Sequence, residues 1–589
     1  MVDRSIAVIR LGVIISLAIG LSYMNEGHSL AYAVGFTVDS PLDGVDANPG
    51  DGVCATVDGY CTLRAAVMEA NALPGRDTIT LGAETYGLSI RRSDEDTAAS
   101  GDLDITDDLE IRGAGTELTV IDGNPPGGVA PFDRTLDVGP GATVLISQLT
   151  IRHGVGDFGG GILNQGSLTL SDVVVREAFA SEGGGVFNAG ALTLDNAVLR
   201  DNEAMFGGGM SNAGTLAVND TAFIHNGGEG SSESVGGGIL HTAGMMTLND
   251  VELSDNVAFF GGAIASASTA TLAGVKVEGN TGLVAGGILN AHIMTISDST
   301  LSENRDRAIF NDGVLTASNT TVSANRVGIF VHDGSVHLLN VTIGDNALGG
   351  IYNSNGPLPN QTIFPTVNVL NSVVARNGAA NCADTNPDLE PTVSGGHNLS
   401  NDSSCAFTAA GDIENTDPML GPLADNGGPT QTQALLPGSP AIDAGDNAAC
   451  PPTDQRGFSR PVDGNGDGIA VCDIGAYEFG AVPAPSQTPS PTPSATSTPP
   501  PIASPTPSPT ASPTAAASPT ASQAATPEPT ATPASRSLPA AFPQTGGRPS
   551  PSGGEPLGAV AVVASAAEVA TSAALWGLRK LNRRRSRSC

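Results

Sequence analysis

Positive charge is scarce in this sequence. Its 589 residues include 26 Lys and Arg against 60 Asp and Glu, and the net charge at pH 7 is −34. Proteins that bind nucleic acids need a basic surface to neutralise phosphates. The charge balance therefore excludes nucleic acid as a partner, and it leaves other surfaces, cations or neutral sugars as the expected ones.

The sequence also lacks the Cys and His spacings of a zinc site. The seven Cys do not follow the spacing of a structural zinc site, and the eight His form no metal-binding cluster in the sequence. Six of the Cys instead lie in close pairs, which predicts local disulfide bridges in an oxidising compartment. The bridges expected from proximity are Cys54–Cys61, Cys382–Cys405 and Cys450–Cys472, with Cys589 left over.

The first 33 residues have the features of an export signal. Arg4 and Arg10 precede the apolar run LGVIISLAIGL, and residues 31–33 (AYA) offer a small-residue cleavage site. The run is too short to span a bilayer, which disfavours the alternative of a membrane anchor. We therefore expect an exported protein with residues 1–33 as its signal peptide.

A glycine-rich unit recurs along the middle of the chain. Only 15% of the residues are charged whereas Gly counts 75, a composition that suits a turn-rich β protein. Three consecutive copies are GGGILNQGSLTL, GGGVFNAGALTL and GGGMSNAGTLAV, and most steps are 20 to 25 residues, with one of 29. A period in this range predicts stacked repeats. The glycine before the first apolar residue falls at Gly161, Gly185, Gly209, Gly238, Gly262 and Gly287.

A second pattern sets the register of the repeat. An Asn follows an apolar residue by three positions in each unit, so Leu199, Phe223, Leu253 and Val277 are predicted to form one interior column. Asn suits turns because it tolerates left-handed backbone, and stacked Asn side chains can form an amide ladder. Each unit is then one coil of short strands about 4.8 Å high. The Asn positions are Asn202, Asn226, Asn256, Asn280, Asn304, Asn325, Asn346 and Asn377.

These repeats predict an all-β parallel β-helix whose coils run from Phe132 to Asn377. Residues 110–380 resemble the right-handed parallel β-helix, or pectin-lyase-like, superfamily, and the right hand is implied by that resemblance. Residues 34–109 contain CTLRAA, which resembles the CSLREA-type N-terminal domain of bacterial surface proteins, with Ala where that family has Glu. We expect this domain to cap the first coil with a short amphipathic helix, RAAVMEANA. Arg64 in it is either a ligand-binding residue or, as favoured, a buried capping residue.

Residues 381–480 are expected to cap the other end. The segments DNGGPT, GSPAIDAG, DQRG and CDIGAYE resemble the choice-of-anchor Q domain, which follows β-helices in exported bacterial proteins. This chain departs from many of those relatives by reading TQTQAL where they carry a His after TQT. Neither this resemblance nor that of the N-terminal cap implies a reaction.

An Asp- and Gly-rich loop lies within this second cap. DGNGDG, residues 463–468, has oxygen-bearing side chains at alternate positions, as a Ca²⁺ loop requires. An EF-hand loop needs Glu at its twelfth position, where this chain has Ile474, so Asp473 serves only if the loop differs. A plain turn is the open alternative. The expected Ca²⁺ ligands are Asp463, Asn465, Asp467, the carbonyl of Ile469, and Asp473.

The last part of the chain consists of a spacer and a tail. Residues 481–541 are rich in Pro, Ser, Thr and Ala, which predicts a disordered, extended spacer. In residues 542–589, FPQTG precedes a 22-residue apolar run, predicted to be helical, and a basic tail. This order resembles a sortase sorting signal, with Phe where LPXTG has Leu. The resemblance implies that a sortase-like transpeptidase cuts between Thr545 and Gly546 and links the protein to the cell envelope.

The same apolar run leaves a membrane anchor as the alternative. A helix of 22 residues is long enough to span a bilayer with its basic tail in the cytoplasm. Glu568 and the many Ala make that span marginal, so the sequence favours sorting. Either way, we expect a protein on the cell surface, attached to the cell wall or membrane through its C-terminus.

Catalysis is the less favoured function. The superfamily often degrades polysaccharides, either with a basic proton abstractor beside Ca²⁺ or with a group of carboxylates. A fold alone does not establish catalysis, and few aromatic residues are present for sugar stacking. We expect an adhesin or scaffold, a monomeric rod that binds a glycan or cell-surface ligand; the alternative is a polysaccharide lyase or hydrolase. The weak catalytic candidates are Arg305, Asp306, Arg307, Asp312, His332 and Asp333.

Overall fold

The computed structural model describes residues 33–91, 97–125, 133–228, 233–353, 366–384 and 392–483. The predicted signal peptide lies outside them except for Ala33, as do the sorting signal and all but residues 481–483 of the spacer. Within the described ranges, no helix has both the length and the hydropathy needed to cross a membrane.

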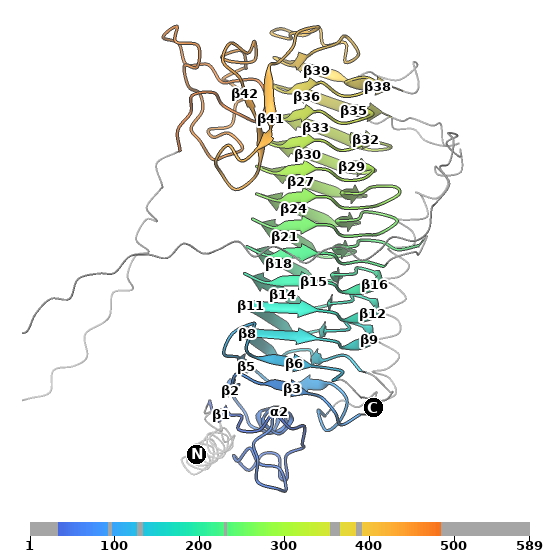
Figure 1. Ribbon diagram of the computed structural model, residues 1–589, viewed down its shortest axis with the longest axis vertical. Coiled ribbons are helices and arrows are strands. Elements are labelled where there is room, and N and C mark those ends of the chain that lie inside the picture. The colour runs from blue at the N-terminus through green and yellow to red at the C-terminus, as the bar shows by residue number, and fades with distance from the viewer. Residues whose placement is uncertain are drawn as a thin grey trace, which may run out of the picture. The chain divides into compact units, whose positions relative to one another are not determined.

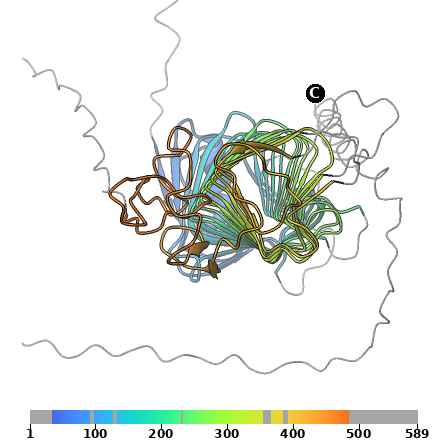
Figure 2. The same cartoon turned by 90° about the horizontal axis from the view of Figure 1, so that it is seen from above.

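The described chain winds into coils of short strands that stack on one another (Figure 1). In one coil, β13 (Val186–Asn188), β14 (Ala191–Asp195), β15 (Val198–Arg200) and β16 (Glu203–Phe206) follow one another around the axis. Each strand pairs in parallel with the equivalent strand of a neighbouring coil, which produces four columns of strands. Seen from above, the strands of successive coils lie over one another (Figure 2). The predicted parallel β-helix is confirmed.

Column 1 is a sheet of 12 strands that contains β13. Its other members are β4 (Leu103–Ile105), β7 (Leu136–Val138), β10 (Ile162–Asn164), β17 (Met210–Asn212), β20 (Ile239–His241), β23 (Ile264–Ser266), β26 (Ile288–Asn290), β29 (Arg307–Asn311), β32 (Val327–Val331), β35 (Gly349–Asn353) and β38 (Cys382–Asp384).

Columns 2 and 3 join into one sheet of 25 strands, because the long strands β8 (Thr143–Arg152) and β11 (Ser167–Arg176) run through both. Column 2 contains β14 together with β1 (Gly35–Thr37), β2 (Asp77–Thr80), β5 (Leu109–Arg112), β18 (Thr215–Asn219), β21 (Met245–Asn249), β24 (Thr269–Ala273), β27 (Ile293–Ser297), β30 (Val314–Ser318), β33 (Ser335–Leu339), β36 (Thr366–Leu370) and β39 (Val393–Gly396).

Column 3 contains β15 together with β3 (Thr85–Gly87), β6 (Val120–Asp122), β19 (Ala222–Ile224), β22 (Glu252–Ser254), β25 (Lys276–Glu278), β28 (Thr300–Ser302), β31 (Thr321–Ser323), β34 (Thr342–Gly344), β37 (Val373–Ala375) and β40 (Leu399–Ser400). Column 4 is short and consists of β16, β9 (Val155–Phe158) and β12 (Phe179–Glu182).

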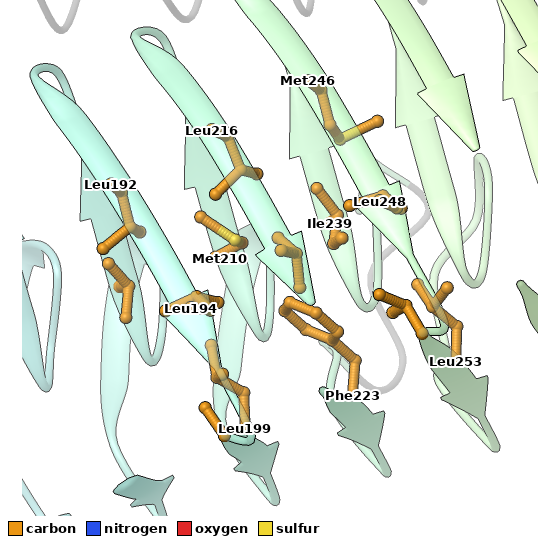
Figure 3. Packing of buried hydrophobic residues seen from close by; sticks show 14 of the residues in the cluster. Leu192, Leu194, Leu199, Met210, Leu216, Phe223, Ile239, Met246, Leu248 and Leu253 are labelled. Atoms are coloured by element: carbon orange, nitrogen blue, oxygen red, sulfur yellow. The ribbon is translucent and has the colours of Figure 1, made fainter. Parts of the chain in front are cut away.

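The interior of the coils is a stack of aliphatic and aromatic side chains. Leu199, Phe223, Leu253 and Val277 are successive partners in the register of column 3, and each is at most 1% exposed. Figure 3 shows the first three lying one behind another in the same interior. The predicted interior column is therefore confirmed.

The Asn ladder is also confirmed, although its backbone differs from the expectation. Asn202 Nδ2 donates to Asn226 Oδ1 at 3.0 Å, and the chain of amide bonds continues coil by coil to Asn381. The left-handed backbone lies one residue earlier, at Asp201 (φ 56°) and His225 (φ 53°). The Asn side chains instead cap backbone groups of the neighbouring coil, as Asn202 Nδ2 does at the carbonyl of Val175 (3.0 Å).

The glycine runs allow the coils to approach closely at the bend before column 1. Gly183 has a φ of 68°, in the left-handed region that favours glycine. A Cβ added to Gly184 would lie 2.4 Å from the carbonyl oxygen of Gly208 in the next coil. Repetition of this contact explains why the unit begins with Gly.

The first coil is covered by helix α2 (Leu63–Ala72), close to the predicted segment, with Thr62 as its N-cap. Arg64 in this helix is fully buried, and its Nε pairs with Asp43 at 2.6 Å. The Arg64 guanidinium also donates to the carbonyl oxygens of Ala98 and Gly101. These contacts confirm the capping interpretation, because they leave no exposed part of Arg64 to meet a ligand.

The stacked coils extend beyond residues 110–380 at both ends. β1 and β2 pair with each other and with β5, while β38, β39 and β40 continue columns 1, 2 and 3. A short segment that contains Ile413 then covers the last coil, and Ile413 forms a parallel bridge with Leu399 of β40. All three predicted disulfides are present, with Cα–Cα distances of 5.1, 4.8 and 6.6 Å.

The segment after that last coil lies on the side of column 3 rather than over the end of the stack. It begins with the antiparallel pair β41 (Leu420–Ala424) and β42 (Thr432–Leu435). Buried Gln455, of the DQRG motif, accepts from Thr321 Oγ1 at 2.6 Å and donates to Thr300 Oγ1 at 2.9 Å. Only part of residues 381–480 is therefore an end cap. The rest is a side clamp that contacts four successive coils, at Thr300, Thr321, Thr342 and Asn371.

Candidate functional site

One residue in each column 1 strand lies on the opposite side from the interior. In β13, Val186 belongs to the interior cluster, whereas Phe187 packs in a separate cluster with Phe158 and Leu163. We name the residues in register with Phe187 the outer row. From the N-terminal coil onward, the outer row is Asp104, Asp137, Leu163, Phe187, Ser211, Leu240, Ala265, Leu289, Phe310, Phe330, Tyr352 and Ala383.

Three aromatic rings stack near the C-terminal end of the outer row. The ring centroids of Phe310 and Phe330 are 5.1 Å apart, and those of Phe330 and Tyr352 are 5.3 Å apart, with interplanar angles of 19° and 10°. The spacing follows from the parallel register, which sets neighbouring strands about 4.8 Å apart. Phe310 is buried, but Phe330 and Tyr352 are half-buried and present part of their surface outward. The three rings form the aromatic ladder.

Arg307 links the aromatic ladder to a group of charges. Its guanidinium carbon lies 4.4 Å from the centroid of Phe330, within the range of a cation–π contact. Arg307 Nη1 also contacts Asp306 Oδ2 at 2.6 Å and donates to the carbonyl oxygen of Val284 at 3.1 Å. Asp306 forms a second ion pair, in which its Oδ1 lies 3.3 Å from Arg326 Nη1. Two arginines therefore neutralise Asp306, which makes it a positioning group for Arg307 rather than a free base.

His332 and Asp312 form a second polar pair beside the ladder. His332 Nδ1 lies 2.7 Å from Asp312 Oδ1, and the His332 ring is 5.7 Å from that of Phe310. The hydrogen bond to Asp312 raises the pKa of His332 above its ordinary value, against the opposite effect of burial. His332 is thus oriented by Asp312 through its Nδ1, and the imidazole lies beside the ladder.

The six weak catalytic candidates divide between this site and its surroundings. Asp306, Arg307, Asp312 and His332 lie around the aromatic ladder, as the coil register predicts. Arg305 is exposed on the preceding bend, and the carboxylate of Asp333 accepts from the amide of Gly334 in its own turn. The ladder itself was missed by the sequence analysis, although its signal is visible as an aromatic residue at the same place in three successive units.

A buried carboxylate lies farther along the same face. Glu182, at the end of β12, is 4% exposed, and its Oε1 accepts from Ser211 Oγ at 2.9 Å. Ser211 is the one Ser of the outer row. Burial raises the pKa of Glu182 to about 7, partly offset by the bond from Ser211. In the sequence, Glu182 is the last residue of the segment FASE, and nothing in that segment indicates a buried carboxylate. Its burial comes from residues of neighbouring coils.

An acidic trio starts the outer row. Asp102, Asp104 and Asp137 have carboxylate oxygens within 4.8 Å of one another, the single such group among the described residues. Arg134 Nη1 lies among them, 2.7 Å from Asp137 and 3.5 Å from Asp102. Burial raises the pKa of Asp102 well above its ordinary value, although Arg134 opposes that shift. The guanidinium accounts for part of the negative charge, so we interpret the trio as an ion-pair cluster.

The predicted Ca²⁺ loop is held together by its own side chains. Asp463 accepts from the amides of Gly466 and Gly468 at 2.7 and 2.8 Å, and Asp467 accepts from the amide of Ile469 at 2.8 Å. Asn465 accepts from the amide of Asp467 at 2.9 Å. These bonds define a loop of successive Asx turns.

Asp473 lies in the buried core beside that loop. It is fully buried, and its two oxygens accept from the amides of Asp443 and Phe479 at 2.8 and 2.5 Å. Burial and the nearby charge of Glu478 raise the pKa of Asp473 to about 8. The carboxylate of Asp473 thus belongs to the buried core of the side clamp, and its role as a Ca²⁺ ligand stays a prediction. The remaining donor set lacks the acidic group that closes an EF-hand loop.

Comparison with known proteins finds similarity in fold only. No protein-family model and no curated protein matches this chain. The A-module of the mannuronan C-5 epimerase AlgE6 of Azotobacter vinelandii is 14% identical over 63% of this chain and 92% of its own, with a TM-score of 0.30. The pectate lyase Pel9A is 12% identical over 76% and 98%, with a TM-score of 0.30. At these values the likeness carries no inference about activity.

Proposed function

We propose that this protein is exported, attached to the cell envelope through its C-terminus, and binds an extracellular glycan as an adhesin or scaffold. The observation that supports glycan binding is the aromatic ladder of Phe310, Phe330 and Tyr352, with Arg307 over the middle ring. Because the rings stack on one another, the half-buried rings of Phe330 and Tyr352 present their edges as an apolar strip. Such a strip, flanked by hydrogen-bonding groups, suits the apolar faces and hydroxyl groups of a sugar.

The charges around the ladder favour a neutral sugar. Asp306 is paired with two arginines, and His332 is paired with Asp312, so neither sign of charge dominates the site. The chain as a whole is strongly negative, which disfavours long-range attraction of anionic polymers. A neutral polysaccharide lying across the ladder is the ligand class that we propose.

Export and attachment rest on the sequence and on the cysteine chemistry. Three disulfides among the described residues are expected of a protein that folds in an oxidising compartment. The order FPQTG, apolar run, basic tail supports a sortase-like transpeptidase that cuts between Thr545 and Gly546 and leaves the coils displayed on the spacer.

A glycan-binding screen of the full-length protein tests the binding proposal, with and without Ca²⁺. Phe330→Ala should weaken saturable binding about tenfold, the equivalent of roughly 1.4 kcal/mol of lost ring contact. Phe179→Ala is the matched control, because Phe179 is an exposed aromatic residue on column 4. Equal binding by wild type and Phe330→Ala would contradict the assignment of the ladder.

A polysaccharide lyase or hydrolase is the second candidate, and the pair of His332 with Asp312 favours it. An imidazole oriented by a carboxylate beside a ligand platform is an arrangement suited to acid–base catalysis. Release of oligosaccharides in the same screen, lost in His332→Gln while binding is retained, would establish this second function. Binding without products would leave the adhesin or scaffold.

A further inference from the structure

The outer surface of column 2 has two rows of residues without a charged side chain. In its strands from β11 to β30, which lie one above another in Figure 1, the first and third residues are at the surface and the second and fourth are buried. The third residues form the threonine row: Thr169, Thr193, Ala217, Thr247, Thr271, Thr295 and Thr316. The first residues form the flanking row: Ser167, Ala191, Thr215, Met245, Thr269, Ile293 and Val314.

Strand propensity alone does not explain the lack of charge. Thr is common in exposed strands because its branched side chain suits the pleated surface. The outward positions of column 3 belong to the same sheet and face water as well, and several of them are charged: Arg152, Arg176, Arg200, Glu252, Lys276 and Glu278. The uncharged rows are therefore a property of column 2 and not of the fold.

The two rows are most exposed over the four strands β21, β24, β27 and β30. Met245, Ile293 and Val314 of the flanking row are 62%, 44% and 40% exposed. Three of the four Thr beside them in the threonine row are exposed as well. We name these four strands the uncharged patch; it sets an apolar row beside a row of hydroxyl groups. Acidic side chains return beyond the threonine row, at Asp195, Asp220 and Asp250.

The spacing of the threonine row is close to a repeat of ordered water. Paired strands lie about 4.8 Å apart. Two water oxygens that are hydrogen-bonded to a common third water at the tetrahedral angle, with O–O distances of about 2.75 Å, are about 4.5 Å apart. Over the three steps from β21 to β30 the difference adds up to about 0.9 Å, less than half the length of one such bond. The hydroxyl groups from Thr247 to Thr316 can therefore follow one row of a tetrahedral water lattice.

We propose that the outer surface of column 2 binds ice, with the uncharged patch at its centre. An ionised side chain holds its own hydration shell, and removing that shell costs free energy, so a charge-free surface complements a neutral lattice. A Thr hydroxyl group both donates and accepts hydrogen bonds, as a water molecule does. Met245, Ile293 and Val314 lose exposed apolar area in the contact, which is favourable.

Two other occupants match the uncharged patch less well. Neither row contains an aromatic ring, the group that most often packs against a sugar. A second copy of the chain would bring together two molecules with a net charge of −34 each, which opposes association. Ice binding goes beyond the proposed function and does not rest on it, because the aromatic ladder belongs to column 1.

Partition into slowly growing ice tests the proposal on the full-length protein. Ice that grows slowly excludes solutes that do not bind it, so the wild type should be enriched in the ice several-fold over Thr271→Lys, which puts a hydrated charge in the middle of the uncharged patch. Val198→Lys is the matched control, because Val198 is a half-buried outward residue of column 3, and it should partition as the wild type does. Thermal unfolding checks that each variant is folded, and Thr295→Lys replaces Thr271→Lys if the latter is not.

The wild type alone can overturn the proposal, by being excluded from ice as fully as an unrelated acidic protein. Equal partition of the wild type and a folded Thr271→Lys would overturn it too, because the ice would then be bound elsewhere. Adsorption to microcrystalline cellulose that Thr271→Lys abolishes, with the wild type excluded from ice, would assign the uncharged patch to a glycan. Self-association that Thr271→Lys abolishes, again with exclusion from ice, would assign it to a second copy.

Discussion

Glu182→Gln should make the stability of the coils less dependent on pH. Glu182 is 4% exposed, and its pKa rises from an ordinary 4.5 to about 7 because its carboxylate is buried. The folded state therefore holds a proton on Glu182 between pH 4.5 and 7, where the unfolded chain has already released it. The contribution of Glu182 to the free energy of unfolding is fully present below pH 4.5 and is lost as the pH rises through about 7.

The magnitude follows from the size of the shift. A difference of 2.5 pKa units, from 4.5 to about 7, corresponds to about 3 kcal/mol at 1.36 kcal/mol per unit. Gln cannot ionise, and its carbonyl oxygen can still accept the bond from Ser211 Oγ. Glu182→Gln should then stabilise the folded state by up to about 3 kcal/mol at pH 8.5 and by nothing at pH 4.

Thermal unfolding of wild type and variant at pH 4 and pH 8.5 measures this difference. Glu203→Gln is the matched control, because Glu203 is an exposed residue of column 4 in the next coil. The expected result is a higher Tm for Glu182→Gln at pH 8.5 only, with no change in the control. Equal melting temperatures at pH 8.5, or an equal gain at both pH values, would refute the argument that Glu182 is buried and protonated.

Three further predictions concern the interior, the side clamp and the attachment. Leu253→Asp should destabilise the coils by several kcal/mol, because it buries an unpaired charge in the interior column, and an unchanged melting temperature would contradict the register. Gln455→Ala should loosen the side clamp, since each of its hydrogen bonds contributes about 1 kcal/mol, and hydrogen exchange should rise in residues 420–483 but not in the coils. Thr545→Ala should leave the protein extractable by detergent, whereas the wild type should need digestion of the wall; wild-type protein freed by detergent with its Trp576 peptide would indicate a membrane anchor.

The coils could be predicted from the sequence because their determinants are local and repeated. Each unit carries its own glycine bend, its own apolar residue three positions before an Asn, and its own alternation of buried and exposed residues. Stacking identical units brings identical positions together, so Leu199, Phe223 and Leu253 meet without any long-range information. The paired cysteines are also close in sequence, and for the same reason their bridges followed from spacing.

The candidate site was only partly predictable. Asp306 and Arg307 adjoin in sequence, and the coil period brings Asp312 to His332. The ladder depends on three rings having the same place in three coils of unequal sequence, and that alignment required the strand register. Residues missed entirely, such as Glu182 and Asp102, are unremarkable in their own segments, since the neighbours that bury them belong to other coils.

The coils and the side clamp differ in how far their structure follows from local sequence patterns. The sequence by itself determined the repeat, its interior column, its Asn ladder and its disulfides, because these features depend on residues a fixed and short distance apart. Only the tertiary structure decided that Gln455 lies against Thr300 and Thr321, and that Asp473 is buried in the core of the clamp. It also decided that the outer row joins an acidic end to an apolar row. Such contacts join residues from different coils or from the clamp to the coils, and their energies depend on which surfaces meet, which no local pattern encodes.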